Sequence, residues 1–413
     1  MKTLDSKQIY KLAEDLLNNP ELGYKEYETK KILIEYFKSH DIKVDKQFLQ
    51  TGFSVSIGSG KPHIGLVAEM DAIPTLNHPY ASKLDNAAHA CGHYSQCVIM
   101  AGVMSLLKQD NFKGKVTLFF TPAEEYTDIK YRESLIKQKK IKYIGGKVNM
   151  LQMGIFDDVD LIVHAHAMGD TKYKYSIGSN LGGFVYKKIT FNGRAAHAAV
   201  TPYLGINALN AYTLFNNAMN MLRETFKDED MVRIHGMIDE GGQTVNSIPE
   251  KVVYECYVRS MNSDALIDVS NRVDMAAKYA AKSIGARASV CTKPGYLPLI
   301  PSNKLSNVFN EEMLKLVKKD EIIVNEKSMA AGDIGDLSIF KPTIQFGYAG
   351  FKGIPHGSSF VIEDKKFVYI DTTKLVYNGV LKLLNDEKLV NDIKKDFKTR
   401  MSKTEYEEYI NAK

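Results

Sequence analysis

Three short apolar runs in the first part of the chain each end in polar residues. They begin at His63 ("HIGLVAEMDAI"), at Lys115 ("KVTLFFTPAEE") and at Val159 ("VDLIVHAHAMGD"). Each run predicts a strand, and residues 95–108, between the first two, have the pattern of a helix. Strands that alternate with helices are typical of an α/β domain with a mostly parallel sheet.

The pattern changes at about residue 181. From there the chain reads strand, helix, strand, strand, helix, strand, with "FVYKKITFNG" and "KVVYECYVRS" among the strands and "INALNAYTLFNNAMNMLRETF" as a long helix. This order is that of the split, ferredoxin-like α+β unit. Because α/β character returns afterwards, we predict a larger α/β domain, residues 1–180 and 295–413, interrupted by a smaller domain, residues 181–294.

The N-terminal stretch "MKTLDSKQIYKLAEDLL" has no apolar signal segment and predicts an amphipathic helix that Ser6 can cap. No stretch approaches the ~18 apolar residues of a membrane span. Four cysteines are too few for a disulfide scaffold in 413 residues, so we expect a cytoplasmic protein with reduced thiols. The net charge of +5 is spread along the chain, which argues against a nucleic-acid partner.

Residues able to act as acids, bases or ligands follow each of the three predicted strands. In open α/β sheets, ligands bind at the carboxyl ends of the strands, so we expect these side chains to lie close together. They are Glu69 and Asp71, Glu124 and Glu125, and His164 and His166. Both histidines lie on the same side of their strand, so both could bind a ligand, or one could be a core residue.

The stretch "AHACGHYSQC" gathers His89, Cys91 and His93 between an acidic and an apolar segment. It allows three interpretations: a metal site, a cysteine nucleophile with a histidine base, or an inert thiol beside surface histidines. A two-metal hydrolytic site needs roughly five protein ligands. It also needs a carboxylate outside the ligand set that accepts a proton from the attacking water. The chain can supply five ligands, with Glu124 left over: Cys91, His93, Glu125, His166 and His356.

The cysteine-nucleophile interpretation ranks second. It needs a base within hydrogen-bond reach and a third group that orients the base. Cys91 and His93 are only two residues apart, and this reading leaves the glutamates after Pro122 without a role. The other three thiols, Cys97, Cys256 and Cys291, are predicted to be small core residues.

Several of these stretches together resemble the dinuclear metallo-amidohydrolases and carboxypeptidases. They are "AEMDAIP", "HACGHYSQC", "TPAEE", "GGKVNMLQMGIFDDVDLIVHAH", "NGRAAHAA", "GGQTVNSIPE", "VRS" and "AAGDIGDLS". The family includes hippurate hydrolase, N-acyl-amino-acid amidohydrolases, auxin-conjugate hydrolases and p-aminobenzoyl-glutamate hydrolase. The resemblance implies a catalytic α/β domain interrupted by a lid domain through which a homodimer forms.

The resemblance also implies residue roles. Cys91 matches the ligand that bridges two metals, and the other four ligand candidates match the remaining ligands, with His166 preferred to His164. Glu124 matches the general base and Asp71 a carboxylate that orients a histidine ligand. His197 resembles a lid residue that steadies the oxyanion in the partner subunit's site. Asn246 and Arg259 resemble residues that hold the substrate carboxylate.

We therefore predict a hydrolase that cleaves the amide bond of N-acyl amino acids or short dipeptides through a metal-bridged hydroxide. Thiolate, imidazole and carboxylate ligands suit zinc best, with manganese, cobalt or nickel as alternatives. A non-catalytic metal-binding relative is a further alternative. Tyr94 stands where the family has Asp, and Glu69 also replaces an aspartate, which leaves the tuning of the site open. Residues 126–143, rich in charge, are predicted to be an exposed insertion.

Overall fold

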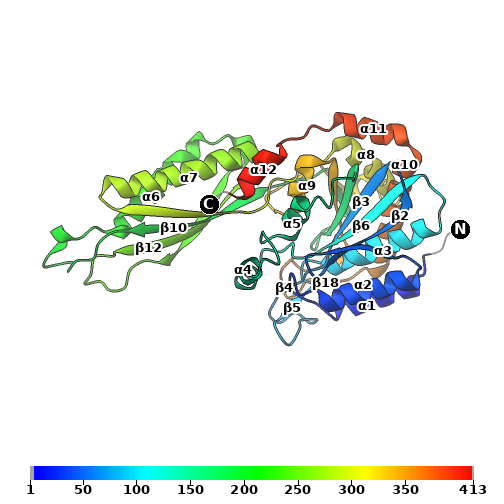
Figure 1. Cartoon of the computed structure of the whole chain (residues 1–413), viewed down its shortest axis with the longest axis horizontal. Coiled ribbons are helices and arrows are strands. Elements are labelled where there is room, and N and C mark those ends of the chain that lie inside the picture. Colours follow the sequence, from blue (N-terminus) through cyan, green and yellow to red (C-terminus); the bar gives the residue numbers. More distant parts are fainter. Residues whose placement is uncertain (1–3, 412–413) are drawn as a thin grey trace. The chain divides into compact units, whose positions relative to one another are not determined.

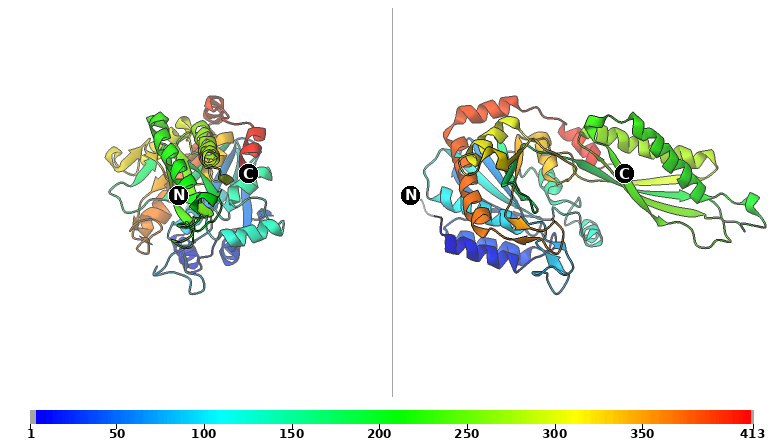
Figure 2. Two further views of the ribbon diagram at one scale, coloured as in Figure 1. Left: turned by 90° about the vertical axis from the view of Figure 1, so that its left-hand side faces the viewer. Right: turned by 180° about the vertical axis from the view of Figure 1, so that it is seen from behind.

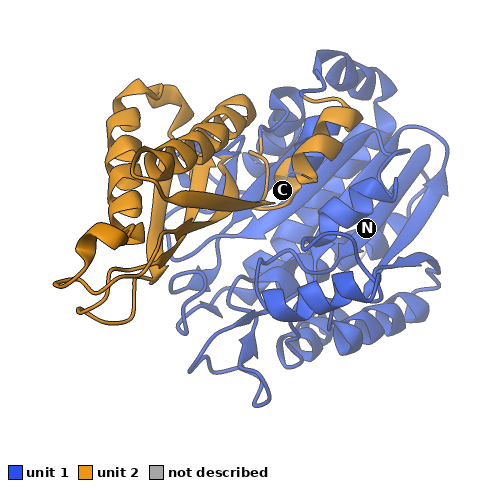
Figure 3. Ribbon diagram, turned by 60° about the vertical axis from the view of Figure 1, so that its left-hand side comes forward, with its two compact units in different colours: residues 1–180, 300–326, 336–400 blue, residues 181–299, 327–335, 401–413 orange. Residues whose placement is uncertain are grey.

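The computed structural model describes residues 4–411, and the chain divides into two compact units. Unit 1 comprises Met1–Asn180, Ile300–Glu326 and Asp336–Arg400, and unit 2 comprises Leu181–Leu299, Lys327–Gly335 and Met401–Lys413 (Figure 3). The mixed α/β fold class that the sequence predicts is confirmed, because unit 1 holds a large, mainly parallel sheet and unit 2 a smaller antiparallel one.

The sheet of unit 1 has eight strands in the order β1-β2-β6-β3-β7-β16-β8-β14. Its centre is parallel, since β3 pairs in parallel with both β6 and β7, and β7 with β16. All seven residues of β3 are buried, as expected for a strand covered on both faces. The bounds are β1 Val44–Phe48, β2 Gly52–Ser59, β3 His63–Glu69, β6 Gly114–Thr121, β7 Leu161–Ala167, β8 Tyr175–Ile177, β14 Ile322–Val324 and β16 Thr343–Tyr348.

Helix α3, His93–Lys108, is the central helix of unit 1. It is buried from its first residue to Leu107 and packs against β3 and β7, while α1 and α2 pack against it in turn (Figure 1). A helix that is apolar on all sides is stable only inside a core, and this core fixes where α3 begins. The other helices of the unit are α1 Ser6–Leu17, α2 Tyr27–Ser39, α4 Ile129–Lys137, α5 Gly146–Gln152, α8 Asn303–Met313, α10 Thr372–Asn385 and α11 Glu387–Asp396.

Two predictions about helical segments differ from the structure. Asp5, and not Ser6, caps α1, because its carboxylate accepts hydrogen bonds from the backbone N–H groups of Lys7 and Gln8. The segment of residues 126–143 is only partly exposed. It forms α4, which buries Arg132 and Leu135 against the end of β6.

Unit 2 has the order β10-α6-β11-β12-α7-β13, which is the predicted ferredoxin-like pattern, with sheet order β11-β12-β10-β13. Its helices lie on one face of the sheet (Figure 2), and α7 presents Leu266, Val269, Val273 and Ala277 to it at helical spacing. The bounds are β10 Gly183–Asn192, α6 Ala208–Leu222, β11 Arg233–Glu240, β12 Lys251–Ser260, α7 Ser263–Ser283 and β13 Arg287–Pro294.

The remaining elements are short. They are β4 Ile73–Pro74, β5 Ala87–Ala88, β9 Asn180–Leu181, β15 Lys327–Ser328, β17 Phe351–Lys352, β18 Val361–Ile362, α9 Ile334–Phe340 and α12 Lys403–Ile410. Cys97 and Cys256 are buried as predicted, but Cys291 is exposed, because its side chain projects from the open side of β13. Within residues 4–411, no helix combines the length and apolar character that crossing a bilayer requires.

Candidate metal centre

Glu124 and Glu125 follow β6 in a turn. Ala123, just before them, has a left-handed backbone with φ 55°, and its N–H donates to the buried carboxylate of Glu26 at 2.9 Å. This turn ends the alternation of side chains that a strand would impose. As a result, Glu124 Oε2 lies 3.8 Å from His93 Nε2, and Glu125 Oε1 lies 3.2 Å from His356 Nε2.

Asp71, two residues beyond β3, joins two of the predicted ligands. One carboxylate oxygen lies 3.2 Å from His93 Nδ1, and the other accepts the backbone N–H of Glu125 at 2.9 Å. The Asp71 carbonyl oxygen also lies 3.0 Å from His93 Nδ1. These contacts put the Nδ1 proton of His93 toward Asp71 and leave Nε2 as the nitrogen that can bind an ion.

The five predicted ligands come together in two groups that share Cys91. One group is Cys91, His93 and His166, and the other is Cys91, Glu125 and His356, with one ligand atom from each residue lying within 4.8 Å of the others. Cys91 Sγ lies 3.4 Å from His166 Nε2. The backbone N–H of His356 donates to the carbonyl of Ala90 at 2.7 Å, which brings the late histidine next to Cys91.

This donor set fits divalent cations. His93 Nε2 is buried and has no hydrogen-bond partner within the described part of the chain, a costly arrangement unless an ion binds there. Burial lowers the pKa of His166 to about 4, so its imidazole stays neutral. Although burial opposes it, the hydrogen bond from His356 lowers the pKa of Glu125 to about 2. A neutral imidazole and an ionised carboxylate are the forms that bind metals.

The cysteine-nucleophile interpretation fits less well. Burial, and then the charge of Glu125, raise the pKa of the Cys91 thiol well above its usual value. A thiol nucleophile needs the opposite shift, because the thiolate is the reactive form.

His164 has a different environment from His166. Its Nε2 lies 3.0 Å from Gln96 Oε1, and its Nδ1 lies 3.1 Å from Gln345 Oε1, so side-chain amides engage both ring nitrogens. His166 contacts the carbonyl of Ala167 through Nδ1 and turns Nε2 toward Cys91. The position of the two histidines on their strand allowed either to be a ligand, and the family resemblance favoured His166; among the described residues, His166 and not His164 lies in a ligand group.

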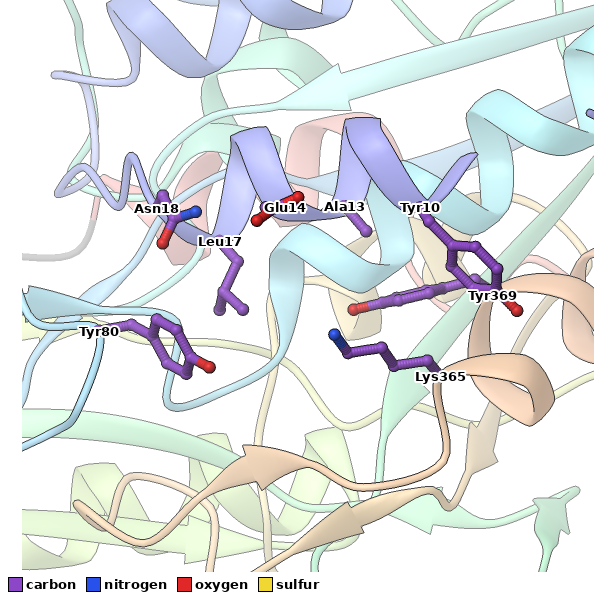
Figure 4. Close-up of a pocket in the computed structure, with 8 residues that line it drawn as sticks. All are labelled: Tyr10, Ala13, Glu14, Leu17, Asn18, Tyr80, Lys365 and Tyr369. Atoms are coloured by element: carbon purple, nitrogen blue, oxygen red, sulfur yellow. The ribbon is translucent and has the colours of Figure 1, made fainter. Parts of the chain in front are cut away.

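Tyr94 is buried, and its hydroxyl lies 2.8 Å from the hydroxyl of Tyr369. Tyr369 in turn lines a cavity of about 410 Å³ between α1 and the segment around Lys365 (Figure 4). None of the five predicted ligands lines this cavity. His89 packs its ring 5.2 Å from that of Tyr94 and is buried, outside both ligand groups.

Sequence reasoning missed a buried polar network behind His93. Glu69, at the end of β3, accepts hydrogen bonds from Lys147 at 2.6 Å and from Gln96 at 2.9 Å. Burial by itself raises the pKa of Glu69, but the charge of Lys147 holds it well below its usual range. The sequence signal for this network is a lysine in the helical stretch "KVNML", and it does not identify the partner.

The three other predicted residues belong to unit 2. His197 is exposed, and its Nδ1 accepts the backbone N–H groups of Ala199 and Val200 at 3.2 and 3.1 Å. Asn246 lies on the adjacent loop, since its carbonyl accepts the N–H of Ala198 at 3.0 Å. On β12, the guanidinium of Arg259 lies over the rings of Phe184 and Tyr257 and donates to the carbonyl of Met329.

Two groups of nitrogen, sulfur and oxygen donors at the carboxyl edge of a parallel sheet have the composition that a two-metal hydrolytic centre requires. Residues 65–368 match the family described as peptidase family M20/M25/M40. This match spans more than half of the chain, so the protein belongs to that family and is a metal-dependent hydrolase.

Individual relatives agree with this assignment. The chain is 27% identical to N-acetyl-L-cysteine deacetylase of Bacillus subtilis, over 95% of this chain and 92% of the relative. It is 25% identical to hippurate hydrolase of Campylobacter jejuni, over 87% and 92%. A solved dinuclear metal-binding peptidase of Bacillus subtilis has the same fold, with a TM-score of 0.72 and 21% identity over 92% of this chain and 99% of that chain.

Proposed function

We propose that this enzyme hydrolyses the amide bond of N-acyl amino acids or short dipeptides that carry a free carboxylate. The observation that carries the proposal is the pair of ligand groups sharing Cys91, with Glu124 beside one of them. The names of two relatives, N-acetyl-L-cysteine deacetylase and hippurate hydrolase, point to the same bond class.

In this proposal, Cys91, His93, Glu125, His166 and His356 hold two divalent ions, with Cys91 shared. Thiolate, imidazole and carboxylate ligands favour zinc over harder cations, while manganese, cobalt and nickel remain candidates. Such ions, when bound, lower the pKa of a water molecule and polarise a carbonyl group.

Glu124 is the proposed general base. Its side chain is almost buried, and it belongs to neither group that contains Cys91. The carboxylate accepts a proton from the water that attacks the amide carbonyl. It then donates that proton to the nitrogen of the leaving amine, so that the carboxylate is regenerated.

His197 is proposed to donate a hydrogen bond to the oxyanion in the partner's site. Two backbone N–H groups donate to its Nδ1, which leaves Nε2 as the ring nitrogen that can donate outward. One fixed donor of this kind typically lowers the barrier by about 3 kcal/mol. Asn246, on the neighbouring loop, and the planar guanidinium of Arg259 are proposed to bind the substrate carboxylate.

Exposed apolar side chains support a homodimer formed through unit 2. Val200, Tyr203 and Leu204 follow His197, and Val245, 100% exposed, precedes Asn246. The two loops lie side by side, as the hydrogen bond between Ile248 and Ala196 shows. Apolar side chains gathered this way are typical of a protein interface.

The test is a hydrolysis screen of N-acyl amino acids and dipeptides with metal-free protein reloaded with each candidate ion. We expect amine release that chelation abolishes and one of the ions restores. Glu124→Gln should lower kcat by about 10²–10⁴ and leave metal content unchanged. The control is Glu14→Gln, at an exposed glutamate of α1.

Three outcomes would reject the proposal. Full activity of Glu124→Gln would show that Glu124 is not the general base. Activity that resists chelators but is lost with iodoacetamide would favour Cys91 as a nucleophile. Bound metal without release of amine from any substrate would indicate a non-catalytic relative.

A further inference from the structure

Lys147 is a fully buried lysine, at 0% exposure, next to the candidate metal centre. Its Nζ donates to Glu69 Oε1 at 2.6 Å, and Glu69 is itself only 2% exposed. Taking both charges out of water is costly, and a pair of this kind often adds no stability over apolar residues of the same size. Its presence beside the ligands therefore calls for a reason other than packing.

Three elements hold Glu69 in one orientation. Its backbone N–H, at the end of β3, donates to Gln96 Oε1 at 3.1 Å, and Gln96 Nε2, from α3, donates to Glu69 Oε2 at 2.9 Å. Lys147, from α5, occupies the other carboxylate oxygen. The side chain therefore has little freedom to rotate, and the direction of Oε2 is set.

Glu69 Oε2 faces the nitrogen that would bind an ion. It lies 3.3 Å from His93 Nε2, and Glu69, His93 and Glu124 form a further group of donor atoms within 4.8 Å of one another. Since His93 Nε2 is buried without a hydrogen-bond partner within residues 4–411, a cation there would meet this carboxylate oxygen at close range.

The charge balance of the site is consistent with Glu69 and Lys147 acting as a pair. Cys91, Asp71, Glu124 and Glu125 supply four negative charges once the thiol is ionised, which matches two divalent cations. Glu69 would add a fifth, and Lys147 offsets it. The pair can thus direct an oxygen at the ion without giving the buried site a net excess of negative charge.

We infer that Lys147 and Glu69 are a positioning pair for the ion at His93: Lys147 orients Glu69, and Glu69 strengthens binding of that ion. The inference rests on the proposed function, because it takes the two ligand groups as the metal centre. It adds a carboxylate and a lysine to the residues that control the occupancy and geometry of one of the two ions.

The experiment titrates cobalt(II) into metal-free protein and follows both the heat of binding and the visible absorption of the cobalt. The main variant is the double substitution Lys147→Met with Glu69→Gln, which removes both charges but keeps the volume. We expect two ions to bind, one of them about 10-fold or more weakly, with an altered cobalt spectrum. Glu69→Asp, which keeps the charge, should bind cobalt more tightly than Glu69→Gln.

The matched control is the ion pair of Lys187 and Asp274 in unit 2, where the Lys187 side chain is also 0% exposed and that of Asp274 is 23% exposed. Lys187→Met with Asp274→Asn should change the melting temperature but not the cobalt affinity or spectrum. If the Lys147 and Glu69 double variant also binds two ions with wild-type affinity and spectrum, the inference is wrong and the proposed function stands. If the wild-type protein binds no cobalt, the metal centre itself is wrong.

Discussion

Glu26 is a carboxylate that the protein buries completely. It accepts hydrogen bonds from Thr51 Oγ1 at 2.6 Å and from the backbone N–H of Ala123 at 2.9 Å. Burial, and then the nearby charge of Asp71, raise its pKa from 4.5 to about 8. Glu26 thus supports the turn that carries Glu124 and Glu125, and at neutral pH it does so as a neutral acid.

This shift predicts how stability depends on pH. The folded protein keeps a proton on Glu26 that the unfolded chain releases above about pH 4.5, so the free energy of unfolding should fall as pH rises from about 4.5 to about 8. Glu26→Gln should weaken this fall. The stability of the variant relative to wild type should therefore be higher at alkaline pH than at acidic pH. Urea unfolding of both proteins across this range measures it. Glu35→Gln, at an exposed position of α2, should leave the wild-type dependence intact, and an unchanged profile for Glu26→Gln would contradict the prediction.

At the scale of elements, the backbone at the start of α3 sets how the side chains of Cys91 and His93 lie relative to each other. Gly92 lies between them with φ 78°, a left-handed conformation that favours glycine. A Cβ atom at this position would lie 2.7 Å from the Cβ of Ala167, the residue after His166. The backbone at Gly92 therefore couples the N-terminus of α3 to the end of β7.

Gly92→Ala should therefore disturb the ligands as well as the fold. The left-handed backbone alone costs roughly 1–2 kcal/mol of stability, and the contact with Ala167 requires a further shift near His166. Gly60→Ala is the control, because Gly60 has φ 86° but no atom within 4 Å of an added Cβ. Thermal unfolding should show a lower melting temperature in both variants. Metal titration should show a lower affinity only in Gly92→Ala. Equal metal affinity in the two variants would refute the coupling.

The elements themselves follow closely from the sequence. The apolar runs that begin at His63, Lys115 and Val159 form β3, β6 and β7, because hydrophobic periodicity is a local property of the chain. The cap of α1 and the packing of α4 were predicted wrongly. The first depends on whether Asp5 or Ser6 reaches the N–H groups, and the second on a partner surface at the end of β6.

At the scale of the whole molecule, the chain returns to unit 2 twice after leaving it. Lys327–Gly335 and Met401–Lys413 belong to that unit, although the hydrophobic pattern groups them with the surrounding α/β segments. Both segments are short, so their assignment depends on which surface they pack against. Periodicity along the chain carries no information about that choice.

Assembly of two chains can be tested by complementation. If His197 acts in the partner's site, protein with His197→Ala and protein with Glu124→Gln should each be nearly inactive alone. Mixed and allowed to exchange subunits, they should recover about a quarter of the wild-type activity, because half of the dimers then contain one complete site. Amine release measures the activity of the mixture, and the mass from light scattering measures whether the chains form dimers. No recovery in a mixture that demonstrably exchanges subunits would place His197 in its own subunit's site or outside catalysis.

The sequence by itself determined the α/β alternation, the ferredoxin-like order of the interrupting unit, and which strand ends carry acids and histidines. These features depend on residue type and on spacing along a short stretch of chain. The family resemblance anticipated that Cys91 is shared and that His166 rather than His164 is a ligand, but only the tertiary structure brings these side chains together and pairs Lys147 with Glu69. Those contacts join residues as many as 265 positions apart, as between Cys91 and His356, and packing of the whole sheet and its helices brings them together.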